Sequence, residues 1–130
     1  MNRFNDYVSA LGRALLAVLF LVSGVGKIAA PTATIGYISS VGLPFPTIGY
    51  GLSAALELGG GLLLLFGYRT RAISLAFAVY SVITAVIFHN NLADQNQMFN
   101  FLKDFAVAGG LLQLFTRGAG SISVDAKRER

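Results

Sequence analysis

Four long apolar stretches alternate with more polar segments along the chain. Each stretch is close to the roughly 20 residues that an α-helix needs to cross the hydrocarbon core of a bilayer. The fourth stretch reaches that length once the residues around Phe99 and Thr116 are included. The pattern predicts an all-α integral membrane protein, a four-helix bundle. We expect its transmembrane helices over residues 10–30, 47–67, 71–89 and 99–117.

Two longer segments connect the predicted helices on one side of the membrane. In the first, "PTATIGYISSVGLPFP", apolar residues recur every three positions at Ile35, Ile38 and Val41, and Gly42 follows as a helix end. This period favours a short helix lying in the membrane interface over a partly buried loop. The second, "HNNLADQNQMFN", is rich in amides, which suit a watery vestibule and a solvent-exposed loop equally well.

The composition agrees with a membrane protein, since 55% of the residues are hydrophobic and 12% are charged. Soluble domains rarely reach that ratio. We expect one domain over residues 1–130, with no room for a soluble catalytic domain. The first helix should be retained as an anchor, because Lys27 stands where small neutral residues precede a signal cleavage site.

The basic residues are shared unequally between the two sides of the predicted bundle. Only Lys27 and Lys103 lie toward one side, whereas the other eight Lys and Arg residues fall on the opposite side. By the positive-inside rule both termini and the "GYRTR" turn are cytoplasmic, and residues 118–130 form a cytoplasmic tail. The net charge of +4 is then a topology signal. These residues can also attract anionic lipid, and they give no reason to expect a nucleic-acid partner.

Cysteine is absent from the sequence, and there is a single histidine. These counts exclude a dithiol redox pair, thiolate-held iron–sulfur clusters, covalent c-type haem and haem held by two histidines of this chain. We expect no metal site and no covalently bound cofactor. Electron chemistry would have to use a diffusible carrier or a partner protein.

One carboxylate, Glu57, interrupts the apolar run "ALELGGGLLLLFGYRTR". Ten residues of helix from Thr47 place Glu57 about 15 Å below the outer boundary of the hydrocarbon core, near the bilayer midplane. A charged side chain at that depth costs about 2.5–3.5 kcal/mol on the insertion scale. Glu57 should therefore face the bundle interior, where it is either paired or neutral. Tyr50 and Ser53 lie on the same helix face.

Three basic or titratable side chains are predicted on the outer halves of the other helices. Lys27 lies near the end of the first helix, His89 ends the third, and Lys103 begins the fourth. We predict a basic pocket, lined by Lys27, Lys103, Tyr50 and Ser53, that opens outward above Glu57 and takes an anionic or carbonyl-bearing ligand. Glu57 and His89 are the candidates for exchanging protons with it.

A plainer interpretation of each residue stays open. Lysines near helix ends often extend their ammonium group to the membrane interface. A histidine at a helix end is often an interfacial polar residue, and Glu57 can belong to a structural hydrogen-bond network. Asp104 lies about 100° around the helix from Lys103, so the two are not necessarily paired.

Several motifs in order resemble the DoxX family of small bacterial four-helix membrane proteins. They are Gly-Lys in "LLAVLFLVSGVGKI", Leu-Glu-x-Gly-Gly in "ALELGGG", Phe-His in "IFHNN", and Lys with Gly-Gly in "FLKDFAVAGGLLQL". The similarity extends over nearly the whole chain and is greatest to the uncharacterised inner-membrane branch. It implies a multi-pass protein of the bacterial inner membrane, with Lys27, Glu57, His89 and Lys103 as the candidate site. Asp104 departs from the amide that the resemblance leads us to expect after Lys103.

The resemblance also implies a redox context, because some family members are linked to a thiosulfate:quinone oxidoreductase and others to membrane complexes that handle oxidative stress. The leading hypothesis is a quinone-interacting or redox-associated membrane subunit, at most one subunit of an oxidoreductase, with soluble or membrane redox partner proteins. The alternatives are a non-enzymatic membrane scaffold for such a complex, and small-solute or proton transport, which would need a homo-oligomer.

Overall fold

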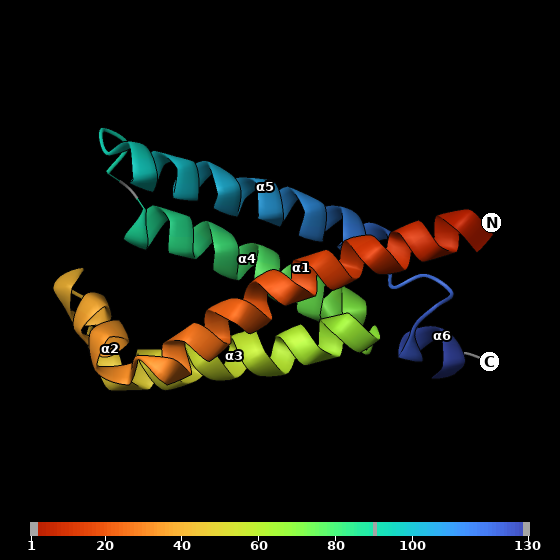
Figure 1. Ribbon diagram of the computed structural model, residues 1–130, viewed down its shortest axis with the longest axis horizontal. Coiled ribbons are helices and arrows are strands. Elements are labelled where there is room, and N and C mark those ends of the chain that lie inside the picture. Colours follow the sequence, from red (N-terminus) through yellow and green to blue (C-terminus); the bar gives the residue numbers. More distant parts are fainter. Residues whose placement is uncertain (1–2, 90, 129–130) are drawn as a thin grey trace.

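The computed structural model describes residues 3–89 and 91–128. Asn90 of the predicted second connection and residues 129–130 of the predicted tail lie outside the described residues. The helices are α1 (Arg3–Ala29), α2 (Pro31–Ser40), α3 (Pro46–Phe66), α4 (Thr70–Phe88), α5 (Gln95–Arg117) and α6 (Val124–Arg128). The long helices run along the molecule, with α2 and the α4–α5 connection at one end and α6 at the other (Figure 1). We call these the α2 end and the α6 end.

The prediction of an all-α protein is confirmed for the part of the chain that the structure describes. Two helices begin earlier than the apolar pattern indicates: α1 at residue 3 and α5 at residue 95. Asp94 explains the early start of α5, because its carboxylate accepts hydrogen bonds from the backbone N–H groups of Asn96 and Gln97 at 2.9 and 3.4 Å. Such an N-cap satisfies donors that the first helical turn leaves unpaired.

Three helices within the described ranges, α1, α3 and α4, are long and apolar enough to cross a membrane. The predicted crossing by α5 and the orientation with both termini inside stay predictions. The segment with a three-residue period is helical, as expected, and begins with Pro31, whose fixed backbone angle suits a first helical position. Its location in the membrane interface also stays a prediction.

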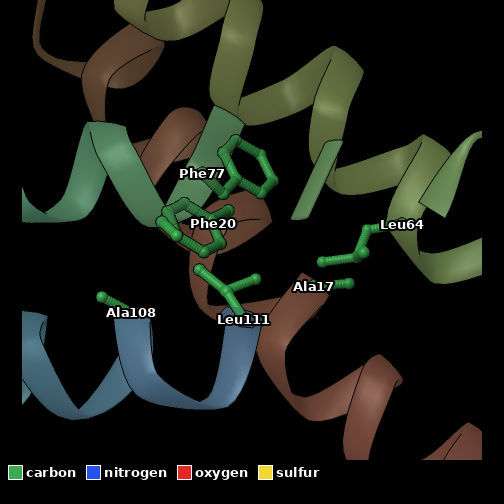
Figure 2. Close-up of a cluster of buried hydrophobic side chains, with 7 residues drawn as sticks. Ala17, Phe20, Leu64, Phe77, Ala108 and Leu111 are labelled. Carbon is green, nitrogen blue, oxygen red and sulfur yellow. The ribbon is translucent and has the colours of Figure 1, made fainter. Parts of the chain in front are cut away.

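The long helices form two packed pairs. α1 packs along α3 and α4 packs along α5, while contacts between the two pairs are fewer. The pairs meet in an apolar core, where the rings of Phe20 and Phe77 stack with centroids 3.9 Å apart. Gly60 leaves space for this stack, since a Cβ atom there would lie 2.7 Å from Phe77 Cζ. Figure 2 shows the core, which consists of Ala17, Phe20, Leu64, Phe77, Ala78, Ala108 and Leu111.

The segment after α5 folds back onto the helices at the α6 end. Arg13, a buried residue of α1, donates hydrogen bonds to the carbonyls of Ala119 at 2.5 Å and Ile122 at 2.9 Å. The Asp125 carboxylate accepts hydrogen bonds from the backbone N–H groups of Arg69 at 2.7 Å and Thr70 at 2.9 Å. Asp125 thereby caps the start of α4. The polar composition of residues 118–130 gave no indication of this packing.

Candidate functional site

Glu57 lies in the middle of α3 and is only 2% exposed. Small residues bring α1 close to this position. A Cβ atom on Gly24 of α1 would lie 2.7 Å from Leu58 Cγ and 3.3 Å from Glu57 Cβ, so only glycine fits the present approach of the two helices. One turn further along α1, Lys27 comes within reach of the carboxylate.

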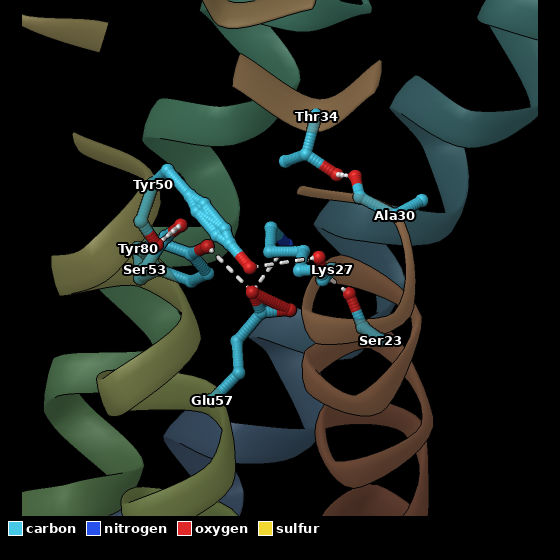
Figure 3. Close-up of polar contacts among 8 residues, drawn as sticks. All are labelled: Ser23, Lys27, Ala30, Thr34, Tyr50, Ser53, Glu57 and Tyr80. Atoms are coloured by element: carbon cyan, nitrogen blue, oxygen red, sulfur yellow. Dashed lines mark hydrogen bonds and ion pairs between the residues drawn. The ribbon is translucent and has the colours of Figure 1, made fainter. Parts of the chain in front are cut away.

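Lys27 and Glu57 form a hydrogen-bonded ion pair through Nζ and Oε2 (Figure 3). The Lys27 ammonium also donates to Ser23 Oγ at 3.3 Å. The Tyr80 hydroxyl of α4 donates to the same Glu57 Oε2 at 3.1 Å. These donors offset the cost of a buried carboxylate, and Tyr80 ties the α1–α3 pair to α4. We call Lys27, Glu57 and Tyr80 the Glu57 pole.

Tyr50 and Ser53 support this arrangement from α3. The Tyr50 hydroxyl donates to the backbone carbonyl of Lys27 at 3.0 Å, and Ser53 Oγ donates to the Tyr50 carbonyl at 3.1 Å (Figure 3). Tyr50 thus fixes the last turn of α1, from which the Lys27 side chain extends. Ser53 lines the cavity, whereas Tyr50, which the sequence analysis also placed in the pocket, is not one of its lining residues.

A second polar group lies where α4 ends against α5. His89 Nε2 is 3.7 Å from Asp104 Oδ2, and the two side chains are 22% and 16% exposed. Lys103 Nζ donates to Asn100 Oδ1 at 3.4 Å. We call His89, Lys103 and Asp104 the His89 pole. The structure therefore pairs His89 with Asp104, one residue beyond the lysine that the sequence analysis selected.

Both poles line one cavity of about 400 Å³, toward the α2 end of the molecule. Pockets for small organic ligands span about 300–1,000 Å³, so this volume suits a small headgroup. All five helices from α1 to α5 contribute to the wall. Its polar side chains are Ser23, Lys27, Thr34, Tyr37, Ser53, Glu57, Tyr80, Ser81, Thr84, His89, Lys103 and Asp104.

The structure brings Lys27 and Glu57 into direct contact and places His89 and Lys103 on the wall of the same cavity. Their chemical roles stay predictions. The sequence analysis did not select Tyr80. A tyrosine within an apolar helix is a usable signal, because a buried hydroxyl normally finds a hydrogen-bond partner. Within the described residues, no group of three or more metal-ligating side chains is placed to hold a metal ion.

The comparisons with known proteins agree with this architecture. The DoxX family model matches residues 8–90, more than half of the chain. The chain belongs to the DoxX family. The matched region includes Lys27, Glu57 and Tyr80, which make up the whole Glu57 pole, and His89 of the other pole. Lys103 and Asp104 follow beyond it.

Curated relatives extend the similarity to α5. The chain is 35% identical over 127 residues to Inner membrane protein YqjF of Escherichia coli, covering 96% of this chain and 95% of the relative. It is 30% identical to Inner membrane protein YphA of the same organism, with 88% and 86% coverage. It is also 36% identical over 87 residues to "Putative oxidoreductase CatD" of Bacillus subtilis, covering 67% of this chain and 63% of the relative. No solved structure matches the chain. This DoxX protein is a multi-pass inner-membrane protein.

Proposed function

We propose that this DoxX protein is a redox-associated membrane subunit that binds a quinone headgroup in the cavity between its helix pairs. The observation that carries the proposal is the Lys27–Glu57 pair in the cavity wall. A charge pair in the apolar part of a membrane protein is costly, and such residues commonly mark ligand or proton pathways. The similarity to a relative named as an oxidoreductase supports the redox part.

The chemistry of the Glu57 pole suits a carbonyl ligand. The Lys27 ammonium has three hydrogens, and it donates to Glu57 Oε2 and Ser23 Oγ, so it retains a donor for a ligand oxygen. Both hydrogen bonds to the Glu57 carboxylate from the described residues end on Oε2. Oε1 is then available to hold or release a proton beside the ligand. A quinone would supply the two-electron chemistry that this cysteine-free chain lacks.

The decisive experiment measures quinone binding by the purified protein in lipid nanodiscs. We expect saturable binding of a short-chain benzoquinone by the wild type. Lys27→Met should weaken the affinity about tenfold, because it removes one charged hydrogen bond. Lys127→Met is the matched control, since Lys127 is exposed on α6, away from the cavity. Undetectable wild-type binding, or equal affinities in the two lysine variants, would contradict the proposal.

A second candidate function, a non-enzymatic scaffold, is favoured by the α6 end. Arg69, Arg71, Arg117 and Lys127 are all exposed there or beside the α3–α4 turn. Such a basic surface fits an acidic partner protein. If quinone binding is absent while neutralising Arg69 and Arg71 abolishes recovery of a crosslinked partner, the scaffold function replaces the quinone proposal.

A further inference from the structure

We infer that the cavity has two ligand-binding poles, and that His89 with Asp104 receives the second oxygen of a single-ring ligand with two opposite carbonyl groups. This inference rests on the proposed function and names the substrate class more narrowly. The Glu57 pole would take one oxygen and the His89 pole the other. The ligand would then contact both helix pairs at once.

The first argument is the set of unpaired polar atoms. His89 Nδ1 and Asp104 Oδ2 are both buried, and neither has a hydrogen-bond partner among the described residues. Buried polar groups are normally hydrogen-bonded, and leaving one unpaired costs about 1–3 kcal/mol. Both residues line the cavity. A ligand oxygen beside the imidazole would provide the missing partner of Nδ1, while Asp104 Oδ2, an acceptor, faces His89 Nε2 at 3.7 Å.

The second argument is the spacing of the two poles along α4. Tyr80 and His89 are nine residues apart, which is about 14 Å along a helix. His89 directly follows Phe88, the last residue of α4. A single ring with opposite carbonyls, extended at each end by a hydrogen bond of about 2.8 Å, spans much of this length.

The third argument is the chemistry of the imidazole. Asp104 lies on the Nε2 side of His89, at 3.7 Å, so Nδ1 is left for the ligand. Nδ1 donates to a carbonyl when the imidazole is protonated, and it accepts from a hydroxyl when the imidazole is neutral. The pole can therefore bind both the carbonyl and the hydroxyl form of one ring.

The charged groups that line the cavity with His89 come from several helices. From α5, Asp104 and Lys103 carry opposite charges. Lys27 of α1 and Glu57 of α3 line the same cavity, and their opposite charges compensate each other. From α2, the Tyr37 hydroxyl donates a hydrogen bond to the Phe88 carbonyl at 3.0 Å.

The test is infrared difference spectroscopy with tetramethyl-1,4-benzoquinone, whose two carbonyls are equivalent in solution. We expect two carbonyl bands in the bound state, both lowered, because each oxygen meets a different pole. Lys27→Met should return one band toward its position in apolar solvent, and His89→Leu should return the other. Asp104→Asn keeps the size of the side chain and should move the same band as His89→Leu, by a smaller amount.

A second measurement compares the quinone with its single-carbonyl ring analogue. The wild type should prefer the quinone about tenfold, the value of one net hydrogen bond, and His89→Leu should lose this preference. If the His89 and Asp104 variants give the same carbonyl bands as the wild type, the inference of a second binding pole is overturned while the proposed function stands. A wild type that binds no quinone would overturn both.

Discussion

Lys27 and Glu57 should contribute unequally to stability, although they form one ion pair. In Lys27→Met the carboxylate stays in the bundle with its side chain 3% exposed and keeps only the hydrogen bond from Tyr80. In Glu57→Gln the ammonium stays with its side chain 23% exposed and keeps Ser23 Oγ at 3.3 Å. The first variant strands a buried charge, whereas the second leaves a charge that can turn toward water.

The magnitudes follow from these environments. Removing one partner of a buried ion pair costs about 3–5 kcal/mol. We expect Lys27→Met to lower the free energy of unfolding by about 3 kcal/mol, the lower limit of that range, because the pair borders a polar cavity. We expect about 1 kcal/mol for Glu57→Gln, because Gln still accepts the Tyr80 hydrogen bond and lysine relaxes outward. The double variant has no stranded charge, so its loss should also be about 1 kcal/mol rather than the sum.

Reversible unfolding in mixed detergent micelles, followed by far-UV circular dichroism, measures these free energies. The double variant should be more stable than Lys27→Met alone by about 2 kcal/mol, since the second substitution removes the unpaired carboxylate. Lys127→Met should leave the free energy of unfolding unchanged. The reasoning is refuted if the two single losses add in the double variant, or if Glu57→Gln is the more damaging of the two.

Three further substitutions test the packing with the same unfolding assay. Gly60→Ala should lower the free energy of unfolding by about 1–3 kcal/mol, because its new methyl would lie 2.7 Å from the Phe77 ring. Gly59→Ala is the control and should leave this free energy unchanged, because its methyl meets no atom within 4 Å. Equal losses in the two variants would contradict this packing. Asp125→Ala should cost about 1 kcal/mol by removing the cap of α4, and an unchanged midpoint would count against the cap. Arg13→Met should lower the free energy of unfolding by about 3 kcal/mol. It should also speed proteolysis of the C-terminal segment, because Arg13 donates hydrogen bonds to two carbonyls of that segment. If the variant is cleaved at the same rate as the wild type, Arg13 does not have that role.

The sequence predicted the helical architecture well because crossing a membrane imposes a length and an apolar composition on each helix. The helix ends were less predictable, since local hydrogen bonds determine them. Asp94 starts α5 before the apolar run begins. Asp125 caps α4 from a distance of more than fifty residues along the chain, so no pattern near α4 reveals it. Arg13 counted as a topology signal, but its buried guanidinium also binds the C-terminal segment.

The candidate site was predictable where membrane depth constrains the residues. A carboxylate in an apolar helix needs a partner, and the sequence analysis placed Lys27, His89 and Lys103 on the outer halves of the other helices. The structure pairs Glu57 with Lys27. The contact between Tyr80 and Glu57 depends on how α4 is rotated against α3, which periodicity does not determine. The pairing of His89 with Asp104 depends in the same way on the register between α4 and α5.

The arrangement of the two helix pairs would give a ligand that contacts both poles a mechanical role. At the α6 end, the C-terminal segment joins them, because Arg13 of α1 and the start of α4 both bind it. Toward the α2 end, the cavity separates Lys27 and Glu57 on one pair from His89 and Asp104 on the other. A ligand that contacts both poles would therefore add a link between the pairs, beside the hydrogen bonds from Tyr80 to Glu57 and from Tyr37 to the Phe88 carbonyl. At 100 times its Kd it would add about 2.7 kcal/mol to the free energy of unfolding.

Spin labels can test this linkage, because the chain has no cysteine and introduced cysteines are unique labelling sites. Val25 on α1 and Leu102 on α5 are exposed toward the α2 end, and Tyr7 and Leu112 are exposed toward the α6 end. A bound quinone should narrow the distance distribution of the first label pair and leave that of the second unchanged, because the C-terminal segment already holds the α6 end together. If neither distribution changes while the quinone is bound, the two helix pairs form one rigid body and the ligand has no linking role.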